Sequence, residues 1–348
     1  MLLLLEFLSC AASVRLTTIL VIHTSAALQP QQALRFNIPC MCYSAQVQES
    51  YDEYCDQFGA VIDIETFARL YGMKLYDNRI KTPPGMDAAF TADTRTEMQQ
   101  IRESIQQFRA LQVSKLGQEI VEQRDRLAKA ELALQTKTTK KATDDKRIAT
   151  NKIERALEKL ADLQRTDLKS GDSRMYPGYY VPVLIMENGK KIVRPMRYQC
   201  RVAGSPENFD TKFPGTYNAR MDNLDGFWRK QFGHTHGVAI VTAFYEYVAG
   251  ANGDKTVLEF KPHGEHNLYV ACLWSHWTAP GKDDLYSFAF ITDAPPAEVL
   301  AAGHDRCIIP LKRENIDAWL DPDPNDLDSL YDILEDRERP YYEHRLAL

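Results

Sequence analysis

The chain has 348 residues, 44% of them hydrophobic, which is enough to bury a full core in one large domain or two modest ones. Its formal net charge of −6 excludes a protein that attracts nucleic acid with its whole surface, so any such contact has to be local. Seven scattered cysteines without a Cys-x-x-Cys pair argue against a disulfide framework and favour a reducing compartment such as the cytoplasm.

Residues 1–40 differ in texture from the rest of the chain. They are apolar, but Glu6 and Arg15 interrupt them, and no run reaches the roughly 18 residues of a membrane span. We expect an upstream extension that precedes the true initiator Met41, or else a weak signal peptide. Residues 41–348 are then expected to form one domain that has no membrane segment.

A helix is predicted at residues 49–71, and a long polar insertion follows it. Two apolar stripes in the insertion repeat at helical spacing, one at residues 98–108 and one at residues 153–160. We therefore expect residues 93–168 to form a helical hairpin whose stripes cover each other. It would be a spacer, a lid or the binding site of an unidentified partner. Clean heptads are too few to predict an oligomer, so we expect a monomer.

From residue 172 onward, short β-rich runs alternate with turn signals, and Asn188-Gly189 indicates a hairpin. Long crossover helices between successive strands are missing, which favours antiparallel pairing. The prediction is an α+β fold: a mainly antiparallel, barrel-like sheet, peripheral helices and the inserted hairpin. The acidic tail is expected to be a solvated closing segment. Later strands are predicted at residues 237–248, 256–261, 268–274, 286–292 and 307–311, with helices at 296–302 and 315–320.

Between Glu187 and Glu207 the chain has five cations and no acidic residue. The stretch fits a local nucleic-acid contact and, equally well, a solvated strand edge on which lysines block aggregation. The cations are Lys190, Lys191, Arg194, Arg197 and Arg201, interleaved with Tyr198.

Four separated segments could carry chemistry, although each is a weak signal alone. A glutamate among aromatic residues is more often structural, and a histidine before Asp-Arg is as often a helix cap. Together and in this order they resemble the SOS response-associated peptidase (SRAP) family, with its Met-Cys, Asn-Ala-Arg, Phe-Tyr-Glu and His-Asp-Arg motifs. The resemblance covers residues 41 to about 319, interrupted by the helical insertion. The segments are Met41-Cys42, Tyr217-Asn218-Ala219-Arg220, Phe244-Tyr245-Glu246-Tyr247 and Gly303-His304-Asp305-Arg306.

The resemblance implies covalent capture of abasic sites in single-stranded DNA, as part of the response to DNA damage and without a cofactor. It assigns Cys42, once N-terminal, as the nucleophile, with Asn218, Glu246 and His304 as its partners. An N-terminal cysteine has an amine and a thiol on adjacent carbons, and a ring-opened abasic site has an aldehyde. The amine can form a Schiff base, on which the thiol closes a thiazolidine ring. The family name further implies a peptidase activity that exposes Cys42.

The DNA contacts are expected from two sources. The resemblance implies a phosphate contact at Arg220 and a strand around Thr292. In addition, aromatic rings can stack on the bases of a single strand while cations follow its backbone. Trp228 suits the core equally well. The expected DNA-binding residues are Arg197, Tyr198, Arg220, Trp228, Arg229 and Thr292.

Two other classes of protein compete with this interpretation. A structural zinc module could use Cys40, Cys42, His234 and His236, but its Cys-x-Cys pair is closer than the usual two-to-four-residue separation, so we expect no metal. A secreted hydrolase would need the leader to be a working signal peptide.

Overall fold

The computed structural model describes residues 44–47, 51–249, 254–264 and 266–347. The leader, Met41 and Cys42 lie outside the described residues, so the expectations for them stay predictions. Within the described chain, no helix is both long and apolar enough to cross a membrane.

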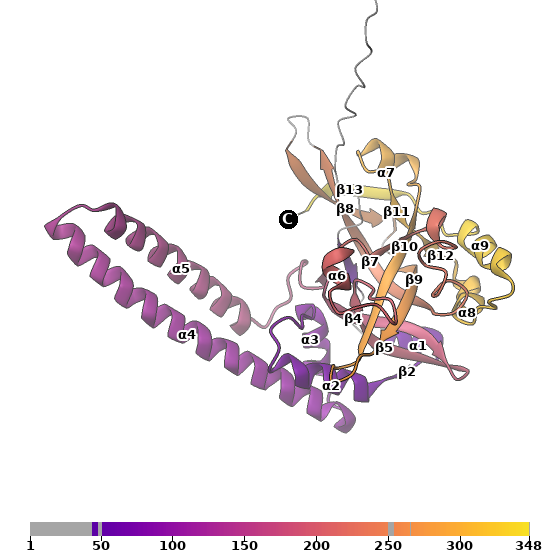
Figure 1. Cartoon of the computed structure of the whole chain (residues 1–348), viewed down its shortest axis with the longest axis horizontal. Coiled ribbons are helices and arrows are strands. Elements are labelled where there is room, and N and C mark those ends of the chain that lie inside the picture. The colour runs from indigo at the N-terminus through magenta and orange to yellow at the C-terminus, as the bar shows by residue number, and fades with distance from the viewer. Residues whose placement is uncertain (1–43, 48–50, 250–253, 265, 348) are drawn as a thin grey trace, which may run out of the picture. The chain divides into compact units, whose positions relative to one another are not determined.

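Five strands of the sheet, labelled in the body of the protein in Figure 1, close into a ring through their pairings. β7 pairs with β9, β9 with β10, β10 with β5, β5 with β4, and β4 again with β7. All of these pairs are antiparallel except β5 with β10, which confirms the α+β prediction and gives the sheet its barrel-like centre. The ring strands are β4 (Tyr180–Glu187), β5 (Lys190–Tyr198), β7 (His236–Ala249), β9 (Leu268–Trp277) and β10 (Leu285–Asp293).

Successive residues of the ring strands enter two different cores, because side chains alternate across a strand. On β7, Ala239 and Val241 belong to an inner cluster built almost entirely of strand residues. Val238 and Ile240 belong instead to an outer cluster that includes helical residues such as Trp319. Since both faces are buried, the ring strands other than β5 are mainly apolar in sequence, whereas β5 contains Lys190, Lys191, Arg194 and Arg197.

The other strands extend or flank this ring. β1 (Ser44–Val47) pairs with β7 and with β3 (Arg174–Met175). β8 (Lys255–Pro262) pairs with β7 and with β13 (Tyr342–Leu346). The predicted later strands are therefore present, although the last is interrupted at Ile309. The remaining short strands are β2 (Val61–Ile62), β6 (Asn218–Arg220), β11 (Cys307–Ile308) and β12 (Pro310–Leu311).

The single helix predicted at residues 49–71 is wrong, because the chain forms two helices there. α1 (Tyr51–Phe58) ends at Gly59, whose φ of 61° favours glycine and terminates the helix. After β2, Asp63 caps α2 (Ile64–Lys74) by accepting a hydrogen bond of 3.0 Å from the Thr66 N–H.

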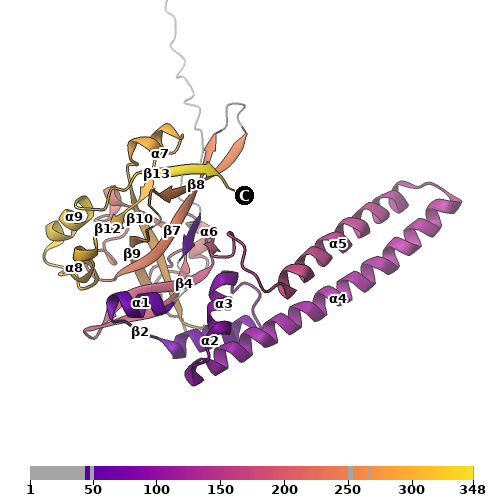
Figure 2. The same cartoon turned by 180° about the vertical axis from the view of Figure 1, so that it is seen from behind.

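The predicted helical hairpin is present as α4 (Gln99–Thr136) and α5 (Lys140–Gln164), which lie side by side in both views (Figures 1 and 2). Its base differs from the prediction. The prediction was that the apolar stripe at residues 98–108 packs against the stripe of the second helix. Instead, Met98, Ile101 and Ile105 are buried in the outer cluster with Phe67 and Phe90. The first turns of α4 are therefore part of the body. The helices beside this base are α3 (Pro84–Ala92) and the 3₁₀ turn η1 (Thr96–Met98).

The acidic tail is not a wholly solvated segment, because it contains α9 (Leu327–Glu335). Asp326 caps this helix by accepting from the Ser329 N–H at 3.2 Å, and carboxylates are favourable at a helix N-terminus. Leu330 and Leu334 lie on one face and are buried in the outer cluster. The other short helices are α6 (Phe209–Lys212), η2 (Met221–Asn223), α7 (Ala297–Ala301), η3 (Arg313–Asn315) and α8 (Ile316–Leu320).

Candidate active site

The first described strand, β1, is held in a fixed register. Ser44 lies opposite Tyr245 of β7. From the other side, the Arg174 Nε donates a 2.9 Å hydrogen bond to the Ser44 Oγ, and its guanidinium carbon lies 3.8 Å from the centre of the Tyr245 ring. The Tyr245 hydroxyl donates to Glu259 at 2.8 Å. Burial, followed by this hydrogen bond, raises the pKa of Tyr245 above its usual value, so the ring stays neutral.

Glu246 and His304 meet beside this strand. Glu246 follows Tyr245 on β7 and is fully buried, and His304 comes after α7 and is 1% exposed. The His304 Nε2 lies 3.1 Å from the Glu246 Oε2. Gly303, with a φ of 99°, provides the backbone turn that leads into His304. The structure thus brings these two predicted residues into contact.

The hydrogen bonds of His304 indicate which of its ring nitrogens carries the hydrogen. The His304 Nδ1 lies 2.9 Å from the Arg306 carbonyl oxygen, which can only accept, whereas the Arg306 N–H is farther away at 3.4 Å. Nδ1 therefore carries the hydrogen of the neutral ring, and Nε2 faces the Glu246 carboxyl group. Burial lowers the pKa of His304 below its usual value and so favours the neutral ring.

Asn218 and Thr292 lie on neighbouring elements of this region. Asn218 is buried on β6, opposite Phe290 of β10. Thr292 is 1% exposed on β10, and its hydroxyl has no hydrogen-bond partner in the described part of the chain. In this structure the Thr292 side chain is thus enclosed rather than presented to solvent.

Arg220 lies at the exposed end of β6. Its Nε donates to Asp222 at 2.8 Å. This hydrogen bond is the main cause that raises the pKa of Arg220, and the nearby charge of Asp305 contributes as well. Asp305 follows His304, so the Asn-Ala-Arg and His-Asp-Arg segments are close enough to interact electrostatically.

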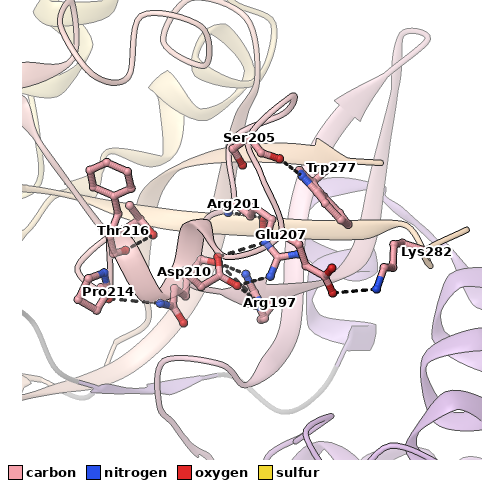
Figure 3. A network of polar contacts seen from close by, with 12 residues as sticks. Arg197, Arg201, Ser205, Glu207, Asp210, Pro214, Thr216, Trp277 and Lys282 are labelled. Atoms are coloured by element: carbon pink, nitrogen blue, oxygen red, sulfur yellow. Dashed lines mark hydrogen bonds and ion pairs between the residues drawn. The ribbon is translucent and has the colours of Figure 1, made fainter. Parts of the chain in front are cut away.

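Arg197, a predicted DNA contact, is committed to internal partners (Figure 3). Its Nη1 lies 3.0 Å from the Asp210 Oδ2, and its Nη2 donates to the Gln199 carbonyl at 3.1 Å. Arg201 binds the same carboxylate through its Nε at 3.2 Å, so two guanidinium groups share one Asp210. Two other cations of this stretch are also paired with carboxylates, Lys191 with Asp317 and Arg194 with Asp63 and Glu187, whereas Lys190 is exposed.

Two of the predicted stacking residues belong to the core. Tyr198 is fully buried, with Phe290 at 5.1 Å between ring centres, and Trp228 is 3% exposed. Neither ring offers a face to a base in this structure, whereas Arg229 is exposed. The exposed aromatic residues nearby are Phe213 and Phe227, whose ring centres lie 6.0 Å apart. Phe213 was not among the predicted stacking residues. Its spacing of four residues from Phe209, across the short helix α6, could have indicated that these two rings lie together.

The four described cysteines are not activated nucleophiles. Cys55, Cys200, Cys272 and Cys307 are free, and burial raises the pKa of each thiol, to about 12 for Cys200. A raised pKa lowers the thiolate fraction on which reactivity depends.

The residues suggested for zinc are not arranged for it in the described part of the chain. The His236 Nε2 accepts a 2.8 Å hydrogen bond from the Gly233 N–H, and its Nδ1 lies 3.0 Å from the Trp319 carbonyl. Burial lowers the pKa of His236 to about 3, so the ring is neutral and both nitrogens are occupied. No group of three potential metal ligands occurs among the described residues, and Cys40 and Cys42 lie outside them.

The fold and site thus define a mixed α/β protein in which a buried carboxyl–imidazole pair adjoins the first strand of a mainly antiparallel sheet. Residues 137–345, more than half of the chain, match the family model described as SOS response associated peptidase (SRAP). The chain belongs to this family. The matched segment contains Asn218, Glu246 and His304 and begins after Cys42.

Among curated relatives, the chain is 28% identical over 120 residues to "Abasic site processing protein YoqW" of Bacillus subtilis, and equally to the protein of the same name of Bacillus phage SPbeta. Each match covers 34% of this chain and 53% of the relative, so the chain spans about half the length of these proteins.

Solved structures with similarity come from Bordetella bronchiseptica and Bacteroides thetaiotaomicron. The first has a TM-score of 0.42 and 16% identity and covers 53% of this chain and 90% of its own. The second has a TM-score of 0.41 and 14% identity and covers 50% of this chain and 76% of its own.

Proposed function

We propose that the chain captures abasic sites in single-stranded DNA covalently, through Cys42 once that residue is N-terminal. The observation that carries the proposal is the buried His304–Glu246 contact of 3.1 Å, placed where β1 pairs with β7. In the sequence, Cys42 precedes Ser44, the first residue of β1, by two positions. Family membership and the name of the curated relatives point the same way.

The chemistry requires two proton movements that the pair can supply. The neutral α-amine of Cys42 adds to the aldehyde of the ring-opened sugar, and loss of water gives the Schiff base. The thiol then adds to the imine carbon, forming the carbon–sulfur bond while its proton goes to nitrogen. In its protonated form Glu246 can donate to the departing hydroxyl, and the His304–Glu246 pair can take up the proton that the amine releases. The α-amine, with an ordinary pKa of about 7.7–8.0, has to lose a proton first.

Other residues orient the reactants rather than exchange protons. Asn218 has an amide that can hydrogen-bond the amine without competing for its proton. Arg174 acts through Ser44 and fixes the start of β1, so we assign it a positioning role. Arg220 is exposed and close to Asp305, which suits a phosphate contact next to His304.

Cys42 has to be freed before it can react. Hydrolysis of the Met41–Cys42 peptide bond, by an aminopeptidase or by the protein itself, consumes one water and releases the α-amine. Intact-mass analysis of protein expressed with its native upstream DNA should give a mass that begins at Cys42. A dominant mass that retains residues before Cys42, in protein that still crosslinks, contradicts the need for this amine.

The direct test uses protein that begins at Cys42 and single-stranded DNA with one abasic site. We expect an adduct that survives heating and denaturing electrophoresis, and little adduct with undamaged or duplex DNA. Cys42→Ser should give an adduct only after borohydride trapping, because its amine still forms a Schiff base. Cys272→Ser and Cys307→Ser are matched controls that should react normally. Equal loss in all three variants, or no adduct with the mature protein, overturns the proposal.

The proposed role of the His304–Glu246 pair in proton transfer has its own test. Glu246→Gln preserves size but removes the exchangeable carboxyl proton, so crosslinking should slow by about 10²–10⁴-fold and lose much of its pH dependence. Stopped time courses across pH 5–9 measure both quantities. A slow variant with an unchanged pH profile means that Glu246 supports the fold but moves no proton.

A further inference from the structure

A cleft at the base of the helical hairpin takes no part in the site described above. Its volume is about 1300 Å³, and its walls come from the segment before α3, from α3 itself, from α4 and from the end of α5. α3 and the base of α4 lie side by side in both views (Figures 1 and 2).

Four cations that line the cleft have no ion pair or hydrogen bond through their side chains with any described residue. We call them the cleft cations. They come from three separate segments, so they surround the cleft rather than follow one helix face. They are Lys81, Arg109, Lys115 and Lys159.

The carboxylates of the cleft are mostly neutralised already. Asp87 pairs with Lys74 at 2.8 Å, and Asp172 pairs with Arg165. Asp162 lies 2.5 Å from the Lys169 ammonium, and Glu119 lies 3.8 Å from that of Lys152. Among the described lining residues, Asp167 alone has a carboxylate without a cation. The cleft therefore has a positive surplus in a chain whose net charge is −6.

The hairpin has the same bias as the cleft. Between residues 99 and 164 there are fourteen Lys and Arg against ten Asp and Glu. The lining also includes the rings of Phe108 and Tyr179 and the apolar side chains of Leu116 and Leu163. Cations beside aromatic and apolar surface suit a single strand, because phosphates bind the cations while bases stack on or contact the apolar wall.

The cleft and the strand that follows Cys42 are connected by a short stretch of the chain. Asp172 lines the cleft, and β3 begins two residues later and pairs with β1, the strand that follows Cys42. The part of the cleft at Asp172 is thus two residues away from the strand that pairs with β1.

We propose that the cleft binds the backbone of single-stranded DNA that flanks the abasic site, with the cleft cations as its phosphate contacts. This inference rests on the proposed function for the identity of the DNA, but its test does not depend on crosslinking.

The test compares two fourfold variants of the mature protein. One replaces the cleft cations by Met. The other replaces Arg126, Lys129, Lys146 and Arg147, which are ion-paired within the hairpin, by Met and so removes the same number of positive charges. Fluorescence anisotropy with an undamaged oligothymidine measures affinity over a range of salt concentrations. Melting curves report whether each variant is folded.

At roughly 100 mM salt the cleft variant should bind the oligonucleotide at least about tenfold more weakly than the wild type. The slope of log binding constant against log salt concentration should become shallower by about two to three, which is about 0.7 for each lost phosphate contact. The control should match the wild type. At saturating protein, both should still form the full amount of abasic-site adduct. Should the fourfold cleft variant not fold, Lys115→Met and Lys159→Met alone should each flatten the slope by about 0.7.

Two outcomes overturn the inference. An unchanged salt slope in the cleft variant means that the cleft holds no DNA phosphate. Binding of a polyglutamate peptide as tight as that of the oligonucleotide, with the same dependence on the cleft cations, means that the cleft is a site for an acidic protein. Loss of the adduct in every protein, with the anisotropy difference intact, would instead refute only the proposed crosslinking function.

Discussion

Two groups of cations in this chain have opposite surroundings. The first, which we call the β5 cations, is the run at residues 190–201 that has no acidic residue in the sequence. Lys191, Arg194, Arg197 and Arg201 nevertheless have carboxylate partners, supplied by other parts of the chain. The cleft cations are scattered over 78 positions, between Lys81 and Lys159, and have none. Folding thus neutralises four of the five cations that are clustered in sequence, and it brings together unpaired cations that are far apart in sequence.

The difference is one of burial and of partner geometry. Arg194 is 8% exposed in its side chain and contacts Asp63 at 2.6 Å. A buried guanidinium that lacked such a partner would be strongly destabilising, so the carboxylates are required by the position of β5. The cleft cations are at least partly exposed and can remain solvated until a ligand arrives.

The largest expected effect comes from breaking the best-buried pair of the β5 group. Arg194→Met should lower the free energy of unfolding by about 3 kcal/mol, because Asp63 is left largely buried without its cation. Urea unfolding at pH 7 measures this loss. A change below about 0.5 kcal/mol would mean that the β5 pairs are as dispensable as surface pairs.

The same variant has a predictable pH dependence. Burial alone would raise the pKa of Asp63, but hydrogen bonds from Arg194 and Thr66 outweigh it and lower the pKa below its usual value. The carboxylate therefore stabilises the wild type above the unfolded pKa of about 3.9, and this contribution is lost as the pH falls below it. In Arg194→Met, burial should raise the pKa instead. The stability difference between the two proteins should be full at pH 7 and shrink toward pH 3, and a constant difference contradicts the assignment.

An intermediate effect should follow from unpairing two β5 cations without removing them. Asp210→Asn leaves Arg197 and Arg201 without their shared carboxylate (Figure 3). We expect the variant to bind single-stranded DNA a few-fold more tightly at low salt. The slope of its log binding constant against log salt concentration should be steeper by about one. Glu207→Gln is the control, because its partner Lys282 is on the surface. Unchanged binding by Asp210→Asn would show that lack of a carboxylate partner is not what makes a cation available to DNA.

The smallest effect concerns stability at the cleft. Lys115→Met should change the free energy of unfolding by less than about 0.5 kcal/mol, because its ammonium has no partner among the described residues to lose. Thermal unfolding of this variant and of the wild type provides the comparison. A loss above 1 kcal/mol would mean that Lys115 supports the packing between α4 and the body.

The sequence was sufficient for most of the fold, because its signals there are local. Hydrophobic periodicity predicted both long helices, and Asn188-Gly189 predicted the turn between β4 and β5, where their φ angles are 52° and 72°. The prediction failed where the end of a helix depends on the conformation of one residue, as at Gly59 after α1. It also failed where a helix depends on contacts with residues far away in the sequence. The acidic composition of the tail concealed Leu330 and Leu334, whose burial depends on the outer cluster.

For the candidate site, the sequence could name only those residues that lie in a recognisable motif. Glu246 and His304 were named from motifs and are in contact. Arg174 was not, because its contacts with Ser44 and Tyr245 join positions 130 and 71 residues away, and nothing in its local sequence indicates them. Tyr198 shows the converse limit: beside arginines it suggests a nucleic-acid surface, although its ring is in the inner cluster.

The pairing of β1 with β7 has a consequence for the order of events during synthesis. Ser44 is made about two hundred residues before its partner Tyr245, and Arg174 is also absent until late. At roughly 5–20 residues per second, the ribosome needs on the order of 10 to 40 seconds to supply β7. During that interval β1 has neither β7 nor β3 to pair with, so Ser44–Val47 cannot take up its register until both partner strands have been made. The first strand of the sheet along the chain is thus among the last to be fixed in place.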